Sequence, residues 1–339
     1  MASYFLFLLF GLVMILFAAE FFTNGIEEFG RHFSFSQAVV GSIFAAVGTA
    51  LPETILPMVA IFMYGGESAK EIGVGAILGA PFMLSTLAFF LVGLTVSIAA
   101  LMKKRAFELK VEAHSIKRDL VFFLAMYSMA IILPLLFGRG FLAFISLALI
   151  AGYILYAYMT FRGESADLEH SEGMYFWRML ARLKGKPSSQ SPPLFLILFQ
   201  VLTALLVMIK GAHTFVQSLE HISARFGMDP LLFALLLAPV ATELPEKFNS
   251  VTWTWKGRDT LAMGNITGAM VFQSTFPVSV GLLFTEWNIT GMALFSALLA
   301  ILSSLTVLGV IILKKRVSPL AVLFGGTLYL VYALVLIFR

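Results

Sequence analysis

The chain has 339 residues, 60% of them hydrophobic and 12% charged, and its mean hydropathy is +0.94. Soluble domains carry about 25% charged residues and a spanning helix needs about 20 mostly apolar ones, so this composition excludes a soluble globular protein and indicates a polytopic membrane protein. The absence of cysteine excludes disulfides, thiolate metal sites and a cysteine nucleophile, and a net charge of +4 carried by short connectors argues against nucleic-acid binding.

Ten apolar runs bounded by charge, glycine or proline are long enough to cross a bilayer, which predicts an all-α protein with ten transmembrane helices. The runs lie near 3–26, 36–64, 70–100, 119–137, 140–161, 193–222, 229–255, 260–284, 289–313 and 317–338. The first run has no Lys or Arg before it and no short Ala-x-Ala site after it, so we expect a spanning helix rather than a signal peptide.

A polar stretch, 162–192, separates the first five runs from the last five and is expected to be a cytoplasmic linker. Its end is rich in proline and serine, as flexible linkers are. Apolar side chains recur in it at helical spacing, at Phe176, Met179, Leu180 and Leu183. The stretch is therefore either a solvated linker or a linker with a short helix lying in the lipid headgroups.

Lysine and arginine fall mainly in alternate connectors. Of 23 such residues, 17 lie in one set of connectors and four in the other set, while Lys210 and Lys247 lie within apolar runs. Positively charged loops are retained in the cytoplasm, so we expect the first set to be cytoplasmic. The chain is then a multi-pass protein of the plasma (inner) membrane with both termini outside the cytoplasm.

The two halves of the chain resemble each other in sequence. A shift of 193 residues lays 47–53 on 240–246, so that a Leu-Pro-Glu occurs in the second span of each half, and a shift of 189 residues aligns the spans that follow. An odd number of spans in each half orients the two copies in opposite senses, as in the inverted repeats of secondary transporters. We expect five-helix repeats over 1–161 and 193–339.

The two acids of these motifs, Glu53 and Glu246, lie well inside apolar runs. A carboxylate facing lipid is costly, so both side chains should face a cavity or a partner. Each preceding proline removes a backbone donor and frees a carbonyl oxygen that could bind a cation where the helix is interrupted. A functional acid is favoured over the alternative, a protonated glutamate hydrogen-bonded inside the bundle.

Further oxygen donors share a helix face with these acids. Thr49 lies one turn before Glu53, and Thr242 and Glu243 lie within one turn of the acid of the second half. Such ligands suit sodium, calcium or magnesium and disfavour zinc or copper, which prefer His or Cys. The five histidines show no paired metal-binding spacing, and His213 is expected to be a packed or hydrogen-bonded helix residue rather than a ligand.

Glycines four residues apart predict close helix packing in the next span of each half, at Gly75 and Gly79 and at Gly264 and Gly268. Close packing would also bring nearby polar side chains toward the acids. These are Ser85, Thr86, Asn265, Gln273, Ser274 and Thr275.

At these residues the sequence resembles the cation/calcium exchanger superfamily, which includes the sodium/calcium exchangers. Its two inverted repeats each carry a Gly-Thr-Ser-Leu-Pro-Glu helix and a Gly-Asn-x-x-Gly-Ser helix. The resemblance covers nearly the whole chain and implies alternating-access antiport with a cation site midway across the membrane. By motif position, Glu53 and Glu246 match the family's paired acids, and Thr49 and Thr242 match its threonines.

Several positions depart from the family pattern. The serine before Leu-Pro-Glu is Ala50 in the first half and Glu243 in the second. The Asn or Asp of the third and eighth helices is Leu84 in the first half and Gln273 in the second. Lys247 adds an intramembrane positive charge, so the exchanged ions and their stoichiometry are left open.

We therefore expect a secondary antiporter without cofactor or covalent chemistry, exchanging calcium or a similar hard cation for sodium or protons. Its partners would be the lipid bilayer and inorganic cations, with the oligomeric state open. The predicted cation ligands are Glu53, Glu246, Glu243, Thr49, Thr242 and Gln273, followed by Lys247, Ser85, Ser274 and Asn265. A monovalent cation/proton antiporter of the same fold and a non-transporting cation sensor stay open, whereas an enzyme is disfavoured because no nucleophile, base and orienting residue are found.

Overall fold

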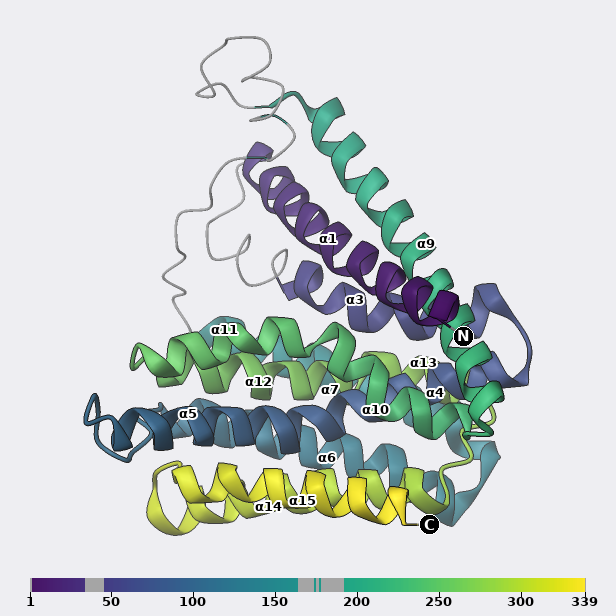
Figure 1. The fold of residues 1–339 in the computed structure, drawn as a ribbon. Coiled ribbons are helices and arrows are strands. Elements are labelled where there is room, and N and C mark those ends of the chain that lie inside the picture. Colours follow the sequence, from purple (N-terminus) through teal and green to yellow (C-terminus); the bar gives the residue numbers. More distant parts are fainter. Residues whose placement is uncertain (1, 34–45, 164–173, 175–176, 178–191, 339) are drawn as a thin grey trace. The chain divides into compact units, whose positions relative to one another are not determined.

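The computed structural model describes residues 2–33, 46–163, 174, 177 and 192–338. In these residues the regular elements are helices, and no strand occurs among them (Figure 1). The helix predicted in the headgroups, around 176–183, lies outside the described residues except for Trp177.

The described residues form α-helices, two π-helices and one 3₁₀ turn. In chain order they are α1 (Ala2–His32), α3 (Ala46–Met58), the π-helix η2 (Val59–Tyr64), α4 (Glu67–Met83), the π-helix η3 (Leu84–Ala88), α5 (Phe89–Leu101), α6 (Ala113–Phe137), the 3₁₀ turn η4 (Arg139–Phe141), α7 (Leu142–Gly163), α9 (Leu194–Phe226), α10 (Pro230–Thr242), α11 (Leu244–Trp255), α12 (Asp259–Gln273), α13 (Phe276–Phe284), α14 (Gly291–Lys314) and α15 (Pro319–Ile337).

Within the described residues, eight helical stretches are long and apolar enough to cross a membrane. They are Ser3–His32, Glu67–Leu101, Ala113–Phe137, Arg139–Thr160, Leu194–Phe226, Asp259–Phe284, Gly291–Lys314 and Pro319–Leu336. The predicted spans near 36–64 and 229–255 contain shorter apolar helices, Ala50–Tyr64 and Pro230–Thr242. The latter is short because a turn at Glu243 divides the predicted span into α10 and α11. The chain is an all-helical, multi-pass protein, and the count of ten spanning helices stays a prediction.

The helices form two compact units, and each unit draws on both halves of the sequence. The first unit comprises 1–64 and 157–222, and the second comprises 65–156 and 223–339. The predicted division into 1–161 and 193–339 concerns the sequence repeats and stays a prediction.

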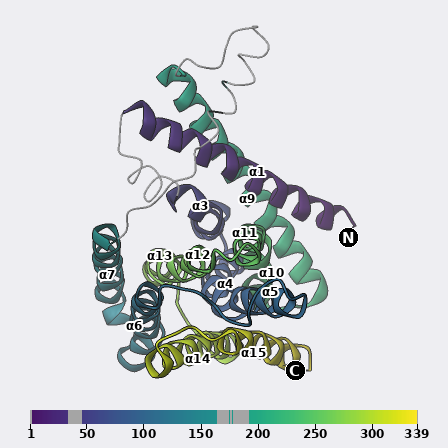
Figure 2. The same cartoon turned by 90° about the vertical axis from the view of Figure 1, so that its left-hand side faces the viewer.

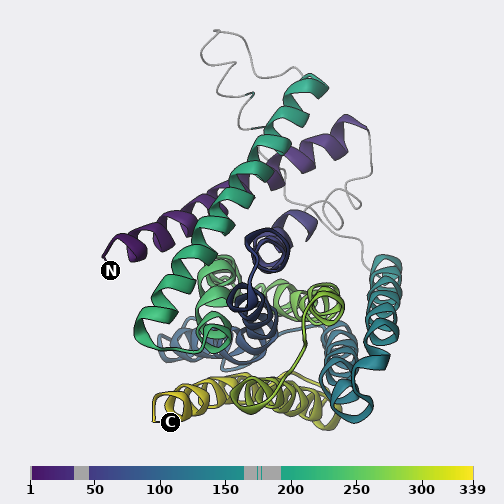
Figure 3. The ribbon, with the colours of Figure 1, turned by 90° about the vertical axis from the view of Figure 1, so that its right-hand side faces the viewer.

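In the first unit α1 and α9 lie side by side and run antiparallel (Figure 3). At their crossing, a Cβ on Gly11 would lie 2.8 Å from the Gly211 carbonyl oxygen, and a Cβ on Gly211 would lie 2.9 Å from that of Gly11. Farther along, Gln200 Nε2 donates hydrogen bonds to Asn24 Oδ1 at 3.1 Å and to the Phe21 carbonyl at 2.9 Å. The two backbones thus approach closely, and polar side chains satisfy one another between apolar helices.

In the second unit α10 packs along α4, and glycines make the contact possible. A Cβ on Gly75 would overlap the Leu231 carbonyl oxygen, and a Cβ on Gly79 would overlap that of Leu235. The close packing predicted for this glycine pair is confirmed. In α12, by contrast, no described atom outside the helix lies within 4 Å of a Cβ built on Gly264.

The substitution Gly79→Ala is expected to destabilise the protein, because the added methyl group meets backbone that cannot rotate away. Overpacking a closely packed interior costs about 1–3 kcal/mol. Thermal unfolding in detergent should therefore show a lower midpoint for this variant. Gly264→Ala is the matched control, since the same methyl group there meets no described atom and alanine favours a helix. Equal midpoints for the two variants would contradict the contact.

Other helices of the second unit pack on one another, and α14 also packs on α4. α5 packs on α15, α6 packs on both α12 and α14, and α14 and α15 lie side by side (Figures 1 and 2). The hydroxyl of Ser303 on α14 donates to the Ser85 carbonyl of η3 at 2.5 Å. The π-helical turn is therefore fixed to a neighbouring helix.

Connectors that the sequence assigns to one side of the membrane meet at one end of the second unit. At one end, Arg105 Nη1 of the α5–α6 connector donates to the Thr254 carbonyl of α11 at 2.7 Å. At the other end, a cavity of about 340 Å³ is lined from α4, α10 and the α13–α14 connector, including Glu67, Asp229 and Asn288. This grouping of connectors agrees with the alternation predicted from the basic residues.

Candidate functional site

The interruption between α10 and α11 is centred on Glu243, which ends one helix and begins the next. Its N–H donates to the Pro239 carbonyl at 2.8 Å, and its carbonyl accepts from the Lys247 N–H at 3.1 Å. Pro245 has no N–H, so the Ala241 carbonyl lacks its helical donor. The Leu-Pro-Glu sequence therefore interrupts the helix as predicted and leaves a backbone oxygen available.

Charged side chains are buried at this interruption. Glu243 is 1% exposed and Lys247 is 3% exposed, and Thr242 beside them is 2% exposed. The Thr242 hydroxyl donates to the Ala238 carbonyl at 3.0 Å, which leaves its oxygen as an acceptor. Burying a charge is costly unless the surroundings compensate it, so both side chains require compensating groups inside the protein.

The backbone of Glu246 lies in the first turn of α11, so that Glu243 and Glu246 are within one turn of each other. The side chain of Glu246 lies outside the described part of the chain. Its predicted role as a ligand stays a prediction.

α12 contributes an amide to the same region through its packing on α11. Asn265 Nδ2 donates to the Ser250 hydroxyl at 3.2 Å, joining the two helices. Gln273, the last residue of α12, is 3% exposed. In a continuous helix the Gln273 carbonyl would accept a hydrogen bond from residue 277, but Pro277 has no N–H. Gln273 can therefore offer both its side-chain oxygen and its backbone oxygen to a ligand.

The two serines among the predicted ligands donate hydrogen bonds to backbone carbonyls three or four residues earlier in the chain. The Ser85 hydroxyl donates to the Pro81 carbonyl at 2.8 Å, and the Ser274 hydroxyl donates to the Val271 carbonyl at 3.0 Å. Both serines are fully buried. Their hydroxyl protons satisfy helix carbonyls, and only their oxygen lone pairs remain for a cation.

Two predicted ligands belong to α3 of the first unit. Glu53 is among the buried charged residues, and Pro57 removes the helical donor for its carbonyl. Thr49 lies one turn earlier on α3, and its side chain is outside the described part of the chain.

The His213 ring packs 5.1 Å from the Tyr64 ring, which confirms a packed histidine.

Among the side chains that the structure describes, no three of His, Asp or Glu are grouped closely enough to hold a metal ion. The second unit therefore brings together Thr242, Glu243 and Lys247 in one stretch, with Asn265 on the adjacent α12. A cation there would need hydroxyl, amide and carbonyl oxygens beside the carboxylates.

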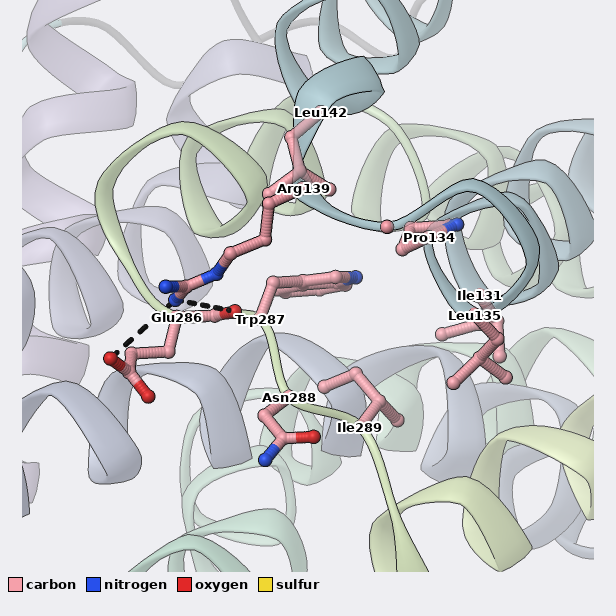
Figure 4. A pocket seen from close by; sticks show the side chains of 10 residues that line it. Ile131, Pro134, Leu135, Arg139, Leu142, Glu286, Trp287, Asn288 and Ile289 are labelled. Carbon is pink, nitrogen blue, oxygen red and sulfur yellow. Dashed lines mark hydrogen bonds and ion pairs between the residues drawn. The ribbon is translucent and has the colours of Figure 1, made fainter.

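Sequence reasoning missed a second cavity, of about 210 Å³, beside the α13–α14 connector (Figure 4). Arg139 Nη2 lies 3.5 Å from Glu286 Oε1 and donates to the Glu286 carbonyl at 3.1 Å. Trp287 is buried with a φ of 45°, and its indole N–H donates to the Ala130 carbonyl at 3.1 Å. Positive φ is unusual for a bulky residue, and nothing in the local sequence, such as a glycine, signals it.

Buried charges at an interruption between apolar helices place the chain in the class of multi-pass membrane transport proteins. The chain belongs to the sodium/calcium exchanger family, whose model, described as sodium/calcium exchanger protein, matches residues 3–162 and 196–339.

Individual relatives support this family membership. The candidate antiporter CaxA of Alkalimonas amylolytica is 26% identical over 283 residues, which cover 81% of this chain and 79% of CaxA. The sodium/calcium exchanger MaX1 of Methanosarcina acetivorans is 23% identical over 324 residues, which cover 86% of each chain. The fold is similar to the crystal structure of the H⁺/Ca²⁺ exchanger CAX, with a TM-score of 0.71 and 18% identity over 99% of this chain and 82% of CAX.

Proposed function

We propose that the chain is a secondary active antiporter that exchanges calcium or a similar hard cation for sodium or protons by alternating access. The observation that carries this proposal is the buried Glu243 at the α10–α11 interruption, beside the predicted acid of the Leu-Pro-Glu motif. The donors around it are oxygens, which hard cations prefer. No bond is made or broken in this function, so the protein acts as a transporter and not as an enzyme.

The inverted-repeat architecture is part of the proposal. α1 and α9, the first helices of the two predicted repeats, run antiparallel, as inverted copies should (Figure 3). The family model matches two stretches, 3–162 and 196–339, that nearly coincide with the predicted repeats. By this arrangement, acids from both repeats would contribute to one site near the middle of the membrane.

A plasma (inner) membrane location with both termini outside the cytoplasm also stays a proposal. It rests on the 17 basic residues in one set of connectors against four in the other. The meeting of the α5–α6 connector with the α11–α12 turn supports the assignment of both to one side.

Exchange of a monovalent cation for protons by the same fold is the second candidate. The observation that favours it is the buried Lys247, a fixed positive charge that reduces the negative charge available to a divalent ion. Ala50 and Leu84 also favour this candidate, because they stand where the family has oxygen ligands and their apolar side chains cannot bind a cation.

Flux across a panel of opposing cation gradients in proteoliposomes tests the proposal. Calcium uptake driven by an outward sodium or proton gradient is the expected result. Uptake of sodium or potassium against protons without calcium flux would favour the second candidate. Cation binding without flux under every gradient would contradict antiport and indicate a sensor.

A further inference from the structure

The first turn of α12 carries a buried carboxylate that the transport proposal does not use. Asp259 is 1% exposed. Its Oδ1 accepts from Arg105 Nη1 at 2.8 Å, and its Oδ2 accepts from Arg105 Nη2 at 2.5 Å and from the Lys110 N–H at 2.8 Å. A bidentate guanidinium–carboxylate pair with a third donor is a strong and geometrically specific contact.

The same guanidinium also binds two carbonyl oxygens. Arg105 donates to the Thr254 carbonyl and to the Glu108 carbonyl, each at 2.7 Å. It thereby joins the end of α11, the start of α12 and the α5–α6 connector. The hydrogen bond with Asp259 raises the pKa of Arg105 above its ordinary value, so the guanidinium stays charged.

A second carboxylate holds α12 two turns farther along. Thr267 donates from its hydroxyl to Asp119 Oδ2 of α6 at 2.7 Å, and Asp119 is 3% exposed. Arg118 donates to Asp119 Oδ1 from Nε at 3.2 Å and from Nη2 at 3.1 Å. The Arg105–Asp259 pair therefore connects α12 to the α5–α6 connector, and the Thr267–Asp119 hydrogen bond connects α12 to α6.

This arrangement is absent from the corresponding position of the first half. The 189-residue shift lays Asp259 on Lys70, whose ammonium lies 3.3 Å from a carboxylate oxygen of Glu67. The Glu67 side chain is 77% exposed, so that pair is a surface contact of little energetic value. Among the described residues, a buried ion pair therefore holds α12, which bears Asn265 and Gln273, whereas the corresponding pair of α4 is exposed.

We propose that Asp259 and Asp119 are positioning residues that fix α12, with its predicted ligands, to the α5–α6 connector and α6, so that these elements move as one body during transport. The proposal rests on the proposed antiport. The α5–α6 connector and α6 of the first half then form the frame that holds the predicted ligands of α12.

A cross-link tests whether these elements move together. The Glu112 N–H donates to the Thr260 hydroxyl at 3.2 Å, and both residues are exposed. In this cysteine-free chain, Glu112→Cys and Thr260→Cys can be bridged by a short bifunctional thiol reagent, with each single variant as control. Exchange at an unchanged rate after bridging is expected. Loss of exchange in the bridged double variant alone would overturn the proposal.

The substitution Asp259→Asn tests the positioning role. We expect the KM for the transported cation to rise about 10- to 100-fold, as when partners that orient metal ligands are removed, while the maximal rate per folded molecule changes little. Asp259→Glu, which keeps the charge, should restore part of the affinity. Glu67→Gln is the matched control and should leave KM unchanged.

A lower maximal rate with unchanged KM in Asp259→Asn would show a purely structural contact and overturn the positioning role. The cross-link still decides the matter if that variant does not fold. Wild-type protein without any exchange would instead count against the proposed antiport itself, so the two failures are distinguishable.

Discussion

Replacing Glu53 or Glu246 by glutamine is expected to abolish cation exchange while leaving a folded protein. Glu53 lies within α3 and Glu246 lies in the first turn after the α10–α11 interruption. Both belong to apolar segments, where a carboxylate compensates the charge of a bound cation. Glutamine keeps the size of the side chain and one acceptor oxygen but removes that charge. Ion flux in proteoliposomes, normalised to the folded fraction from size-exclusion chromatography, measures the effect.

Glu286→Gln is the matched control for these two variants. Glu286 has a 70% exposed side chain and pairs with Arg139 at the end of the second unit, so its neutralisation should leave flux near the wild-type rate. If protons compete for the same carboxylates, removing either acid should also flatten the pH dependence of exchange. Wild-type flux in both Glu53→Gln and Glu246→Gln would leave these residues without a role in binding.

Removing Lys247 is expected to change the number of charges moved in each cycle. With all four side chains ionised, the three intramembrane acids Glu53, Glu243 and Glu246 and the single Lys247 carry a net charge of −2, which suits one divalent or two monovalent cations. Lys247→Met removes one positive charge and makes the net charge −3, so the site should bind an additional cation or proton. The reversal potential of exchange in reconstituted vesicles reports the resulting stoichiometry.

The double variant Glu243→Gln with Lys247→Met provides the charge-balanced control. It returns the net charge to −2 and should restore partial activity with the wild-type reversal potential. Glutamate four residues before lysine is also the favourable order for an ion pair on one helix face. If both variants keep the wild-type stoichiometry and pH profile, the two residues form only such a pair.

Eight of the ten predicted spans correspond to helices of spanning length among the described residues, because hydrophobic length is a local property. The interruption at Glu243 was also predictable, since Pro245 cannot donate to the preceding turn. The tight contact at Gly75 and Gly79 followed from their spacing. These features depend on residues close together in the chain.

The contacts that hold α12 could not be predicted in the same way. Arg105 and Asp259 are 154 residues apart, and each is an ordinary charged residue near a helix end. Gly264 and Gly268 show that spacing alone can also mislead. They repeat the spacing of the α4 glycines without a comparable contact among the described residues. Spacing tells which face a residue occupies, whereas the partner of that face is set by the three-dimensional arrangement.

The contact between α4 and α10 has a thermodynamic consequence. Both helices can form before they pack, because a bilayer obliges each segment to satisfy its own backbone hydrogen bonds. Glycine has no side chain to immobilise, so the approach of Gly75 and Gly79 to the Leu231 and Leu235 carbonyls costs no rotamer entropy. The Cα–H groups can also form weak hydrogen bonds to these oxygens. Association of α4 and α10 is therefore expected to be driven by enthalpy.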